Sequence, residues 1–193
     1  MTTKHGKLFV VSGPSGAGKT VLCSKMLERF QPRMVYSISA TSRNPRGAEK
    51  DGAEYFFYSP ERFEREIKDG CFAEWAKVHG NYYGTPRAFV DEKCRNGFHV
   101  LLNIDVQGAL KIKVSYPDAV MVFIQPPSLQ VLEERLRRRN MDSEESLRNR
   151  LANAKQEMEC SDRYQHVLIN DDLAKAEKDL EQIFLAHDAE TRN

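Results

Sequence analysis

The residues whose types and spacing most clearly indicate chemistry form a glycine-rich loop near the start of the chain. The loop reads Gly13-Pro14-Ser15-Gly16-Ala17-Gly18-Lys19-Thr20. Glycines let the backbone bend where a Cβ would clash, so successive N–H groups can turn inward and surround an anion. Lys19 can bridge the terminal phosphates of a nucleotide, and the Thr20 hydroxyl can bind Mg2+. The loop predicts a site for nucleotide phosphates without specifying a reaction.

The segments on either side of the loop support this interpretation. Residues 7–12 are apolar and β-branched, as expected of a buried parallel strand. Between Lys19 and about Phe30, one face of a predicted helix carries the apolar residues Val21, Leu22, Met26, Leu27 and Phe30. The N-terminus of that helix adds positive partial charge to the loop. This context favours phosphate binding over the alternative, a structural turn that happens to carry a lysine.

Two arginines and two tyrosines form a second candidate phosphate site. Arg43 and Arg46 lie three residues apart in the polar segment 42–52, which its proline and glycines mark as a loop. Tyr55 and Tyr83 belong to the same part of the chain. Guanidinium groups match a phosphate dianion, and phenol hydroxyls add uncharged donors. The alternative is that both arginines are solvated loop residues.

A further cluster of arginines lies between residues 135 and 150. It surrounds a polar break at residues 140–143 and consists of Arg135, Arg137, Arg138, Arg139, Arg148 and Arg150. Two helices that meet at a polar turn have the geometry of a mobile lid. Some of these arginines can equally be solvated helix faces.

The remaining pattern predicts the framework that positions these residues. Strands at 7–12, 98–104, 119–124 and 166–169 alternate with helices. This alternation predicts a parallel sheet with helices on both faces, and it places phosphate chemistry at the C-terminal ends of the strands.

Two excursions leave this predicted sheet, at about residues 36–85 and 128–155. In the first we expect a helix beginning at Pro60 and strands at 34–41, 55–58, 72–78 and 82–84. Ser59, Thr85 and Ser128 are expected as helix N-caps. The helix after Ser128 is expected to direct Leu129, Leu132 and Leu136 inward.

Composition excludes several classes of protein. The 193 residues are 40% hydrophobic and 30% charged, which is typical of one globular α/β domain. A formal net charge of +1 gives no general basic field, so nucleic acid is not expected as a partner. No apolar run is long enough to span a membrane, and the polar N-terminus lacks a signal-peptide pattern, so a cytoplasmic protein is expected. Four scattered cysteines indicate free thiols rather than a metal site.

Taken together, the motifs resemble those of the guanylate kinases over nearly the whole chain. Besides the glycine loop, they comprise Ser-x-x-x-Arg-x-Pro-Arg-x-x-Glu at 39–49, Glu-Trp at 74–75, Asn-Tyr-Tyr-Gly at 81–84, Ile-Asp-x-Gln-Gly at 104–108 and a late Asn-Asp at 170–171. The glycine loop is shared by many families, whereas the segment 39–49 with residues 81–84 is much more specific. The resemblance implies a P-loop α/β fold with an inserted GMP-binding lobe at 36–85 and a helical lid at 128–155. The core then comprises residues 1–35, 86–127 and 156–193 of a single domain.

The resemblance also implies roles for the acceptor-side residues. The GMP phosphate is expected to bind Arg43, Arg46, Tyr55 and Tyr83, with Glu49 closing the same motif. Guanine presents N1–H and a 2-amino donor beside the O6 acceptor, so a carboxylate can accept twice while a hydroxyl donates to O6. By family position these groups are Glu74, Ser39 and Thr85. Glu74 could instead be a solvent-facing strand carboxylate.

On the donor side, the resemblance implies that ATP phosphates contact the loop and the lid. Lys19, Arg43, Arg46, Arg139 and Arg150 are the expected catalytic residues, because phosphoryl transfer depends on positioning and charge neutralisation. Arg135 is expected to assist at ATP, Arg150 also at GMP, and Asn170 beside the adenine. Thr20 and Asp105 are the expected metal-side residues for Mg2+.

The chain departs from the family pattern just before Asp105. Family members carry an acid two residues earlier, where this chain has Asn103. Asparagine keeps the size of aspartate but loses its charge, and a hydrogen bond to a charged group is worth about 1.5–3 kcal/mol. If Asn103 contacts guanine or metal-bound water, that contact is therefore weakened.

The sequence thus predicts transfer of the γ-phosphoryl group of ATP to GMP, and also to dGMP, with Mg2+. Two alternatives stay open: a guanylate-kinase-like module that binds phosphopeptides, and a related kinase of a ribose phosphate. The first typically lacks the glycine loop and lid arginines that this chain retains. A monomer or small homo-oligomer without a nucleic-acid or membrane partner is expected.

Overall fold

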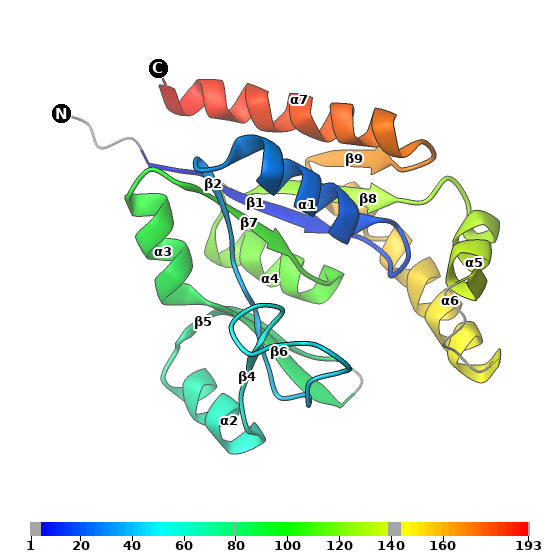
Figure 1. The fold of residues 1–193 in the computed structure, drawn as a ribbon, viewed down its shortest axis with the longest axis horizontal. Coiled ribbons are helices and arrows are strands. Elements are labelled where there is room, and N and C mark those ends of the chain that lie inside the picture. The colour runs from blue at the N-terminus through cyan, green and yellow to red at the C-terminus, as the bar shows by residue number, and fades with distance from the viewer. Residues whose placement is uncertain (1–4, 79, 139–143, 193) are drawn as a thin grey trace.

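The computed structural model describes residues 5–78, 80–138 and 144–192, and its main sheet has five parallel strands (Figure 1). Their order across the sheet is β2-β7-β1-β8-β9. The strands are β1 (Leu8–Ser12), β2 (Met34–Tyr36), β7 (His99–Asn103), β8 (Val120–Gln125) and β9 (His166–Ile169). The glycine loop follows the central strand, so strands on both sides bring their C-terminal ends next to it.

Helices cover both faces of this sheet, which confirms the predicted fold class. The helices α1 (Lys19–Phe30) and α7 (Leu173–Arg192) cover one face, and α3 (Arg87–Arg95) and α4 (Val106–Ser115) cover the other (Figure 1). All of β1 is buried, because Phe9 and Val11 pack toward α1 and α7 whereas Leu8 and Val10 pack toward α4. A strand buried on both faces explains the continuous apolar run in the sequence.

A second, smaller sheet is built from the first excursion. It has the order β4-β3-β6-β5, and its elements are β3 (Ala40–Thr41), β4 (Phe56–Phe57), α2 (Pro60–Lys68), β5 (Phe72–Val78) and β6 (Asn81–Pro86). Its own core centres on Phe63 of α2, whose ring stacks on Phe72 at 4.4 Å and on Tyr82 at 5.3 Å between centroids. Ser59 is the N-cap of α2, as predicted, and its Oγ accepts the Arg62 N–H at 3.2 Å.

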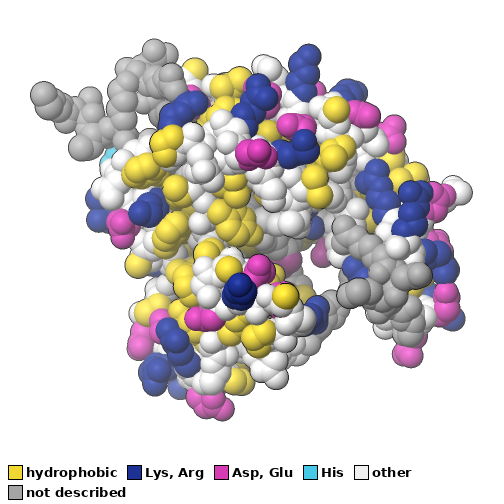
Figure 2. Space-filling model, viewed as in Figure 1, with side chains coloured by type: hydrophobic (Ala, Val, Ile, Leu, Met, Phe, Trp, Pro, Cys, Tyr) yellow, Lys and Arg dark blue, Asp and Glu magenta, His cyan; other side chains and the backbone are white. Residues whose placement is uncertain are grey.

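The second excursion forms a helical arm. It consists of α5 (Leu129–Arg138) and α6 (Glu144–Met158), followed by the short helix η1 (Ser161–Arg163) before β9. Leu132 and Leu136 of α5 pack against Leu147 and Ala154 of α6. The polar break predicted at 140–143 lies outside the described residues. In Figure 2 the surface is hollowed between the second sheet and this arm.

Four predictions about local structure were wrong. The strand expected at 34–41 is two strands in different sheets, because β2 pairs with β7 while β3 pairs with β6. Thr85 is not an N-cap: β6 continues through Pro86, and the Thr85 hydroxyl is used across the sheet. The side chains of Val21 and Leu129 are 45% and 37% exposed, since each lies at the edge of its helix's apolar face.

None of the helices in the described part of the chain combines the length and apolar composition of a membrane-spanning segment.

Candidate active site

The glycine loop occupies the turn between β1 and α1, and its conformation requires glycine. Gly13 has φ 137° and lies so close to β8 that a Cβ there would be 2.1 Å from the Ile124 carbonyl oxygen. Gly18, the N-cap of α1, has φ 95°. Lys19 Nζ donates to the carbonyl oxygens of Gly13 and Pro14 at 2.6 and 2.9 Å. The ammonium therefore lies across the loop, where it can meet an incoming phosphate.

Two residues at the C-terminal end of β7 lie beside the start of α1. Asn103 Nδ2 donates to Thr20 Oγ1 at 3.4 Å. Asp105 caps α4, because its Oδ1 accepts the N–H groups of Gln107 at 2.8 Å and Gly108 at 3.1 Å. Its Oδ2 is not used in this cap. β7 pairs directly with β1, which is why residues more than eighty positions apart meet here.

The residues expected to bind the acceptor phosphate are assembled around Arg43, which is 9% exposed. Its guanidinium donates to both carboxylate oxygens of Glu49, at 2.9 and 3.1 Å, and Nε donates to the Tyr83 hydroxyl at 3.3 Å. The Tyr55 ring lies 5.3 Å from the guanidinium carbon and 5.9 Å from the Tyr83 ring. The antiparallel pairing of Thr41 with Tyr83 places this tyrosine next to the loop after β3.

Glu49 fixes the geometry of this cluster. Besides the Arg43 guanidinium it accepts the backbone N–H of Arg46 at 2.7 Å, and these two bonds hold the pKa of the Glu49 carboxyl below its usual range. The same pairing raises the pKa of Arg43. The Arg46 side chain is exposed. The structure thus brings Arg43, Glu49, Tyr55 and Tyr83 together and leaves Arg46 on the outer side of the loop.

Glu74 and Thr85 form a buried pair across β5 and β6. They are paired directly in the antiparallel register, and the Thr85 hydroxyl donates to Glu74 Oε1 at 2.7 Å. The exposed fractions are 6% for Glu74 and zero for Thr85. Burial raises the pKa of Glu74 to about 7, against the Thr85 hydrogen bond, with Asp105 adding to the rise and Lys111 opposing it. Ser39 is half-buried at the start of β3.

The arm contributes two arginines to contacts with the loop region. Arg150 Nη2 donates to Ser15 Oγ at 2.8 Å, although the two residues are 135 positions apart. Arg135 Nη2 donates to the backbone oxygen of Asn170 at 2.9 Å. Arg139 lies outside the described residues. Arg137 pairs with Glu133 and Glu144 on the outer surface, as expected of a solvated face.

The comparisons with known proteins agree with this geometry. A sequence profile described as guanylate kinase matches residues 5–187. The chain belongs to the guanylate kinase family. It is 45% identical over 183 residues to a guanylate kinase of Caldanaerobacter subterraneus subsp. tengcongensis, covering 95% of this chain and 88% of the relative. For the guanylate kinase of Carboxydothermus hydrogenoformans the identity is 48% over 181 residues, with coverage of 94% and 88%.

A solved guanylate kinase has the same fold. The crystal structure of the enzyme from Anaplasma phagocytophilum is 32% identical in sequence and superposes with a TM-score of 0.76. The match covers 96% of this chain and 87% of the solved chain. The family assignment therefore includes both sheets and the arm, not the glycine loop alone.

Sequence analysis assigned no role to Gly108, although it ends the Ile-Asp-x-Gln-Gly motif, and it missed Glu157. Gly108 of α4 faces Glu74, and a Cβ there would lie 2.7 Å from Glu74 Oε2. Glu157 of α6 is half-buried, and burial raises the pKa of its carboxyl while nearby Lys19 lowers it. The one local signal for Glu157 is its position three residues after buried Ala154, on the same helix face. The motif contains Gly108 but does not indicate its packing role, because the Glu74 contact comes from another element.

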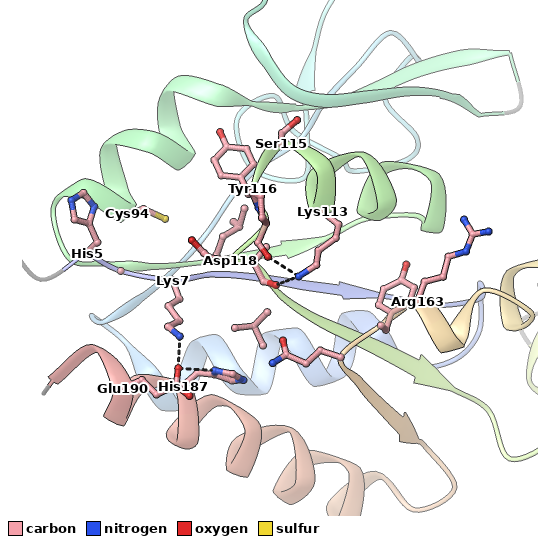
Figure 3. A pocket seen from close by; sticks show the side chains of 17 residues that line it. His5, Lys7, Cys94, Lys113, Ser115, Tyr116, Asp118, Arg163, His187 and Glu190 are labelled. Carbon is pink, nitrogen blue, oxygen red and sulfur yellow. Dashed lines mark hydrogen bonds and ion pairs between the residues drawn. The ribbon is translucent and has the colours of Figure 1, made fainter.

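A half-open cavity among the described residues lies at the opposite end of the sheet, away from these motifs. Its volume is ≈ 950 Å3, and Figure 3 shows Lys7, His187 and Glu190 along one wall. Lys7 pairs with Glu190, and His187 Nδ1 lies 3.2 Å from Glu190 Oε2. Lys113 Nζ donates to the Pro117 carbonyl at 2.7 Å. The cavity is therefore separate from the family's site. Its polar groups already bind one another, so they do not form a prepared ligand site.

Proposed function

We propose that the protein transfers the γ-phosphoryl group of ATP to GMP, giving ADP and GDP, and that it also accepts dGMP. The observation that carries this proposal is the buried Glu74–Thr85 pair on the second sheet. A carboxylate held in the protein interior needs donors to replace water. Guanine supplies two such donors, N1–H and the 2-amino group, side by side.

Within this pair, Thr85 orients the carboxylate. A hydroxyl has one hydrogen, and that of Thr85 is directed at Glu74 Oε1. Ser39 is then the hydroxyl available to donate to guanine O6. Adenine has an amino group where guanine has O6 and lacks the N1 proton, so this arrangement favours GMP over AMP.

The Arg43 cluster is the proposed site of the GMP phosphate. Glu49 holds the Arg43 guanidinium in a fixed plane, and the Tyr55 and Tyr83 hydroxyls flank it. Arg46, which is exposed on the same loop, would add a second positive charge to this phosphate site. Pre-oriented donors favour a dianion because little side-chain freedom remains to be lost on binding.

The glycine loop is the proposed site of the ATP phosphates. Its backbone N–H groups and Lys19 receive the phosphates, and the arm brings Arg150, with Arg139 and Arg135 as further contributors. Arg150 contacts the loop at Ser15 and Lys19 contacts it at Gly13 and Pro14, so together they can neutralise the charge of the phosphoryl group during transfer.

The residues at this point also fit Mg2+, which prefers oxygen ligands. The Thr20 hydroxyl and the Asp105 carboxylate would hold it, because Thr20 is exposed and Asp105 keeps Oδ2 outside the α4 cap. The ion would neutralise the charge that develops on the phosphates. Asn103 keeps the Thr20 hydroxyl in place.

We further propose the division into a core, a GMP-binding lobe at 36–85 and a lid at 128–155, with the protein acting in cytoplasmic purine nucleotide metabolism as a monomer or small homo-oligomer. Separate sheets for the core and lobe, and a separate apolar cluster for the arm, support this division.

The test is an assay of ADP release at saturating Mg-ATP with GMP, dGMP, AMP and ribose bisphosphate as acceptors. We expect turnover with the guanine nucleotides alone. Turnover with ribose bisphosphate but not GMP, or no turnover with GMP, would overturn the proposal.

A further inference from the structure

The residue that follows β9, Asn170, contacts three parts of the site at once. Its side chain is 5% exposed, and Nδ2 donates to the Ala17 carbonyl oxygen at 2.8 Å. Its own N–H donates to the Gln125 carbonyl at the end of β8, at 2.8 Å, so the residue is anchored to the sheet. Its carbonyl oxygen accepts from Arg135 of α5. Asn170 thus joins the sheet, the glycine loop and the arm.

The contact with the loop is close enough to depend on both partners. A Cβ on Gly18 would lie 2.2 Å from Asn170 Nδ2. Gly18 therefore serves two purposes: it adopts φ 95°, and it leaves room for the amide to reach Ala17. A larger residue at either position would separate the loop from β9.

Peptide planarity converts this contact into an orientation of the loop. The Ala17 carbonyl and the Gly18 N–H belong to one planar trans peptide, so they point in opposite directions. When Asn170 holds the carbonyl on one side, the Gly18 N–H must point to the other. That N–H belongs to the set that surrounds the phosphates in such loops.

We infer that Asn170 is a positioning residue, which orients the Gly18 N–H toward the ATP phosphates by holding the Ala17 carbonyl, and which joins α5 to the loop through Arg135. This role rests on the proposed use of ATP. It differs from reading the adenine base, because it acts on the phosphates through the loop.

Packing on the other side of the loop supports the same role. The methyl groups of Leu132 and Leu136 lie 2.8 and 3.0 Å from the position of a Cβ on Gly16. Helix α5 therefore packs directly on the loop at Gly16 while Arg135 holds it to Asn170. The loop is fixed from β9 and from α5 together.

The inference is tested by titrating Mg2+-ATP and Mg2+-tripolyphosphate into the full-length protein and two variants. Asn170→Asp keeps the shape but sets a carboxylate against the Ala17 carbonyl, and Asn170→Ala only removes the donor. We expect the dissociation constants of both ligands to rise together, about tenfold for Asp and about threefold for Ala. The KM for ATP should rise similarly, with kcat and the KM for GMP within about twofold. Asn96→Asp, at an exposed position after α3 and outside every motif, is the matched control and should change neither dissociation constant.

Three results would overturn the inference. If ATP binding weakens while tripolyphosphate binding does not, the amide reads adenine. If the unfolding temperature falls but both constants stay unchanged, the role is structural only. If both variants bind as the wild type does, Asn170 has no part in phosphate binding. If Asn170→Asp does not fold, Asn170→Ala is used for the same comparison of the two ligands. Failure of the wild type to bind either ligand would overturn the proposed function together with the inference.

Discussion

At the scale of single residues, the main feature is the carboxylate of Glu74, which is buried although burial of a charged carboxylate is energetically unfavourable. Glu74 is almost fully buried, receives one hydrogen bond from Thr85, and lies near Asp105, with Lys111 as the opposing charge. Lys111 itself donates to the Trp75 carbonyl, so its charge is shared. The unliganded protein therefore holds this carboxyl close to its point of half-ionisation near neutral pH.

One consequence is a pH dependence of GMP binding. Guanine needs an ionised carboxylate, and the pKa of Glu74 is about 7, so the competent fraction falls as pH drops below 7. Between pH 8 and pH 6 we expect the KM for GMP to rise about tenfold. Steady-state kinetics across this range measures it, with Glu74→Gln as the control that reports titration of the GMP phosphate. A wild-type profile parallel to that of the variant would contradict the prediction.

A second consequence concerns stability. The folded-state pKa of Glu74 lies above the ordinary glutamate value of 4.5, so the folded protein binds the Glu74 proton more tightly than the unfolded chain does. Stability is then lost as pH rises from about 5 through 7. We expect Glu74→Gln to unfold less readily than the wild type at pH 8, by about 1–3 kcal/mol, with the difference vanishing near pH 5. Urea titrations of the wild type and the variant at pH 5 and pH 8 measure this difference. A variant that is less stable than the wild type at pH 8 would contradict the prediction.

At the scale of elements, the GMP side of the site depends on how close α4 approaches β5. Gly108 permits that approach, because its missing Cβ is the space that Glu74 Oε2 occupies. Asp105 begins the same helix through its cap. One helix therefore sets the position of Glu74, the proposed base-reading carboxylate, and of Asp105, the proposed metal ligand.

Substituting Gly108 tests this arrangement. Gly108→Ala favours the helix by about 0.5–1 kcal/mol but places a Cβ 2.7 Å from the Glu74 oxygen. We expect the KM for GMP to rise about tenfold while the KM for ATP stays within twofold. The control is Lys113→Ala, at the far end of α4. Ala109→Gly in the same helix is not used, because Ala109 is buried. Equal effects on both substrates would argue against a local displacement of Glu74.

At the scale of the whole molecule, chemistry and anchoring lie at opposite ends of the main sheet. The proposed phosphate-binding groups follow the C-terminal ends of β1, β7 and β9, whereas the end of α7 is held at the other end of the sheet (Figure 1). Asp188 of α7 pairs there with Arg33 and accepts a hydrogen bond from His99 Nε2 at 3.1 Å. His99 Nδ1 accepts the Lys7 N–H at 3.0 Å, which leaves Nε2 as the protonated nitrogen.

Removing this anchor should therefore affect folding and not catalysis. Asp188→Ala removes the ion pair with the partly exposed Arg33 and leaves the buried Nε2–H of His99 without a partner, so we expect a loss of about 1–3 kcal/mol in unfolding free energy. The matched control is Glu177→Ala, which breaks the more exposed pair with Lys25 and should cost less than about 1 kcal/mol. Chemical denaturation with parallel kinetics measures both. A changed KM for either nucleotide would show that the two ends are coupled.

Features set by local sequence patterns could be predicted, whereas features set by contacts between elements could not. The bounds of α1 and β5 were predicted to the residue, because helical periodicity and strand alternation are local signals. The change of sheet between Tyr36 and Ala40 has no local signal, since both halves alternate alike. Thr85 was assigned to a helix from its neighbouring proline, whereas its partner, Glu74, lies on another strand. Motif resemblance pointed to the residues of the Arg43 cluster and included Gly108, but it did not predict the role of Gly108, which depends on a contact between α4 and β5.

The measurement that tests the central claim most directly is the ratio of kcat/KM for GMP to that for AMP, in the wild type and in Glu74→Gln. The glutamine amide donates where guanine also donates, and it can instead donate to adenine N1. We predict that the ratio falls at least about tenfold in the variant, through loss with GMP. An unchanged ratio would show that the buried Glu74–Thr85 pair does not read the guanine base.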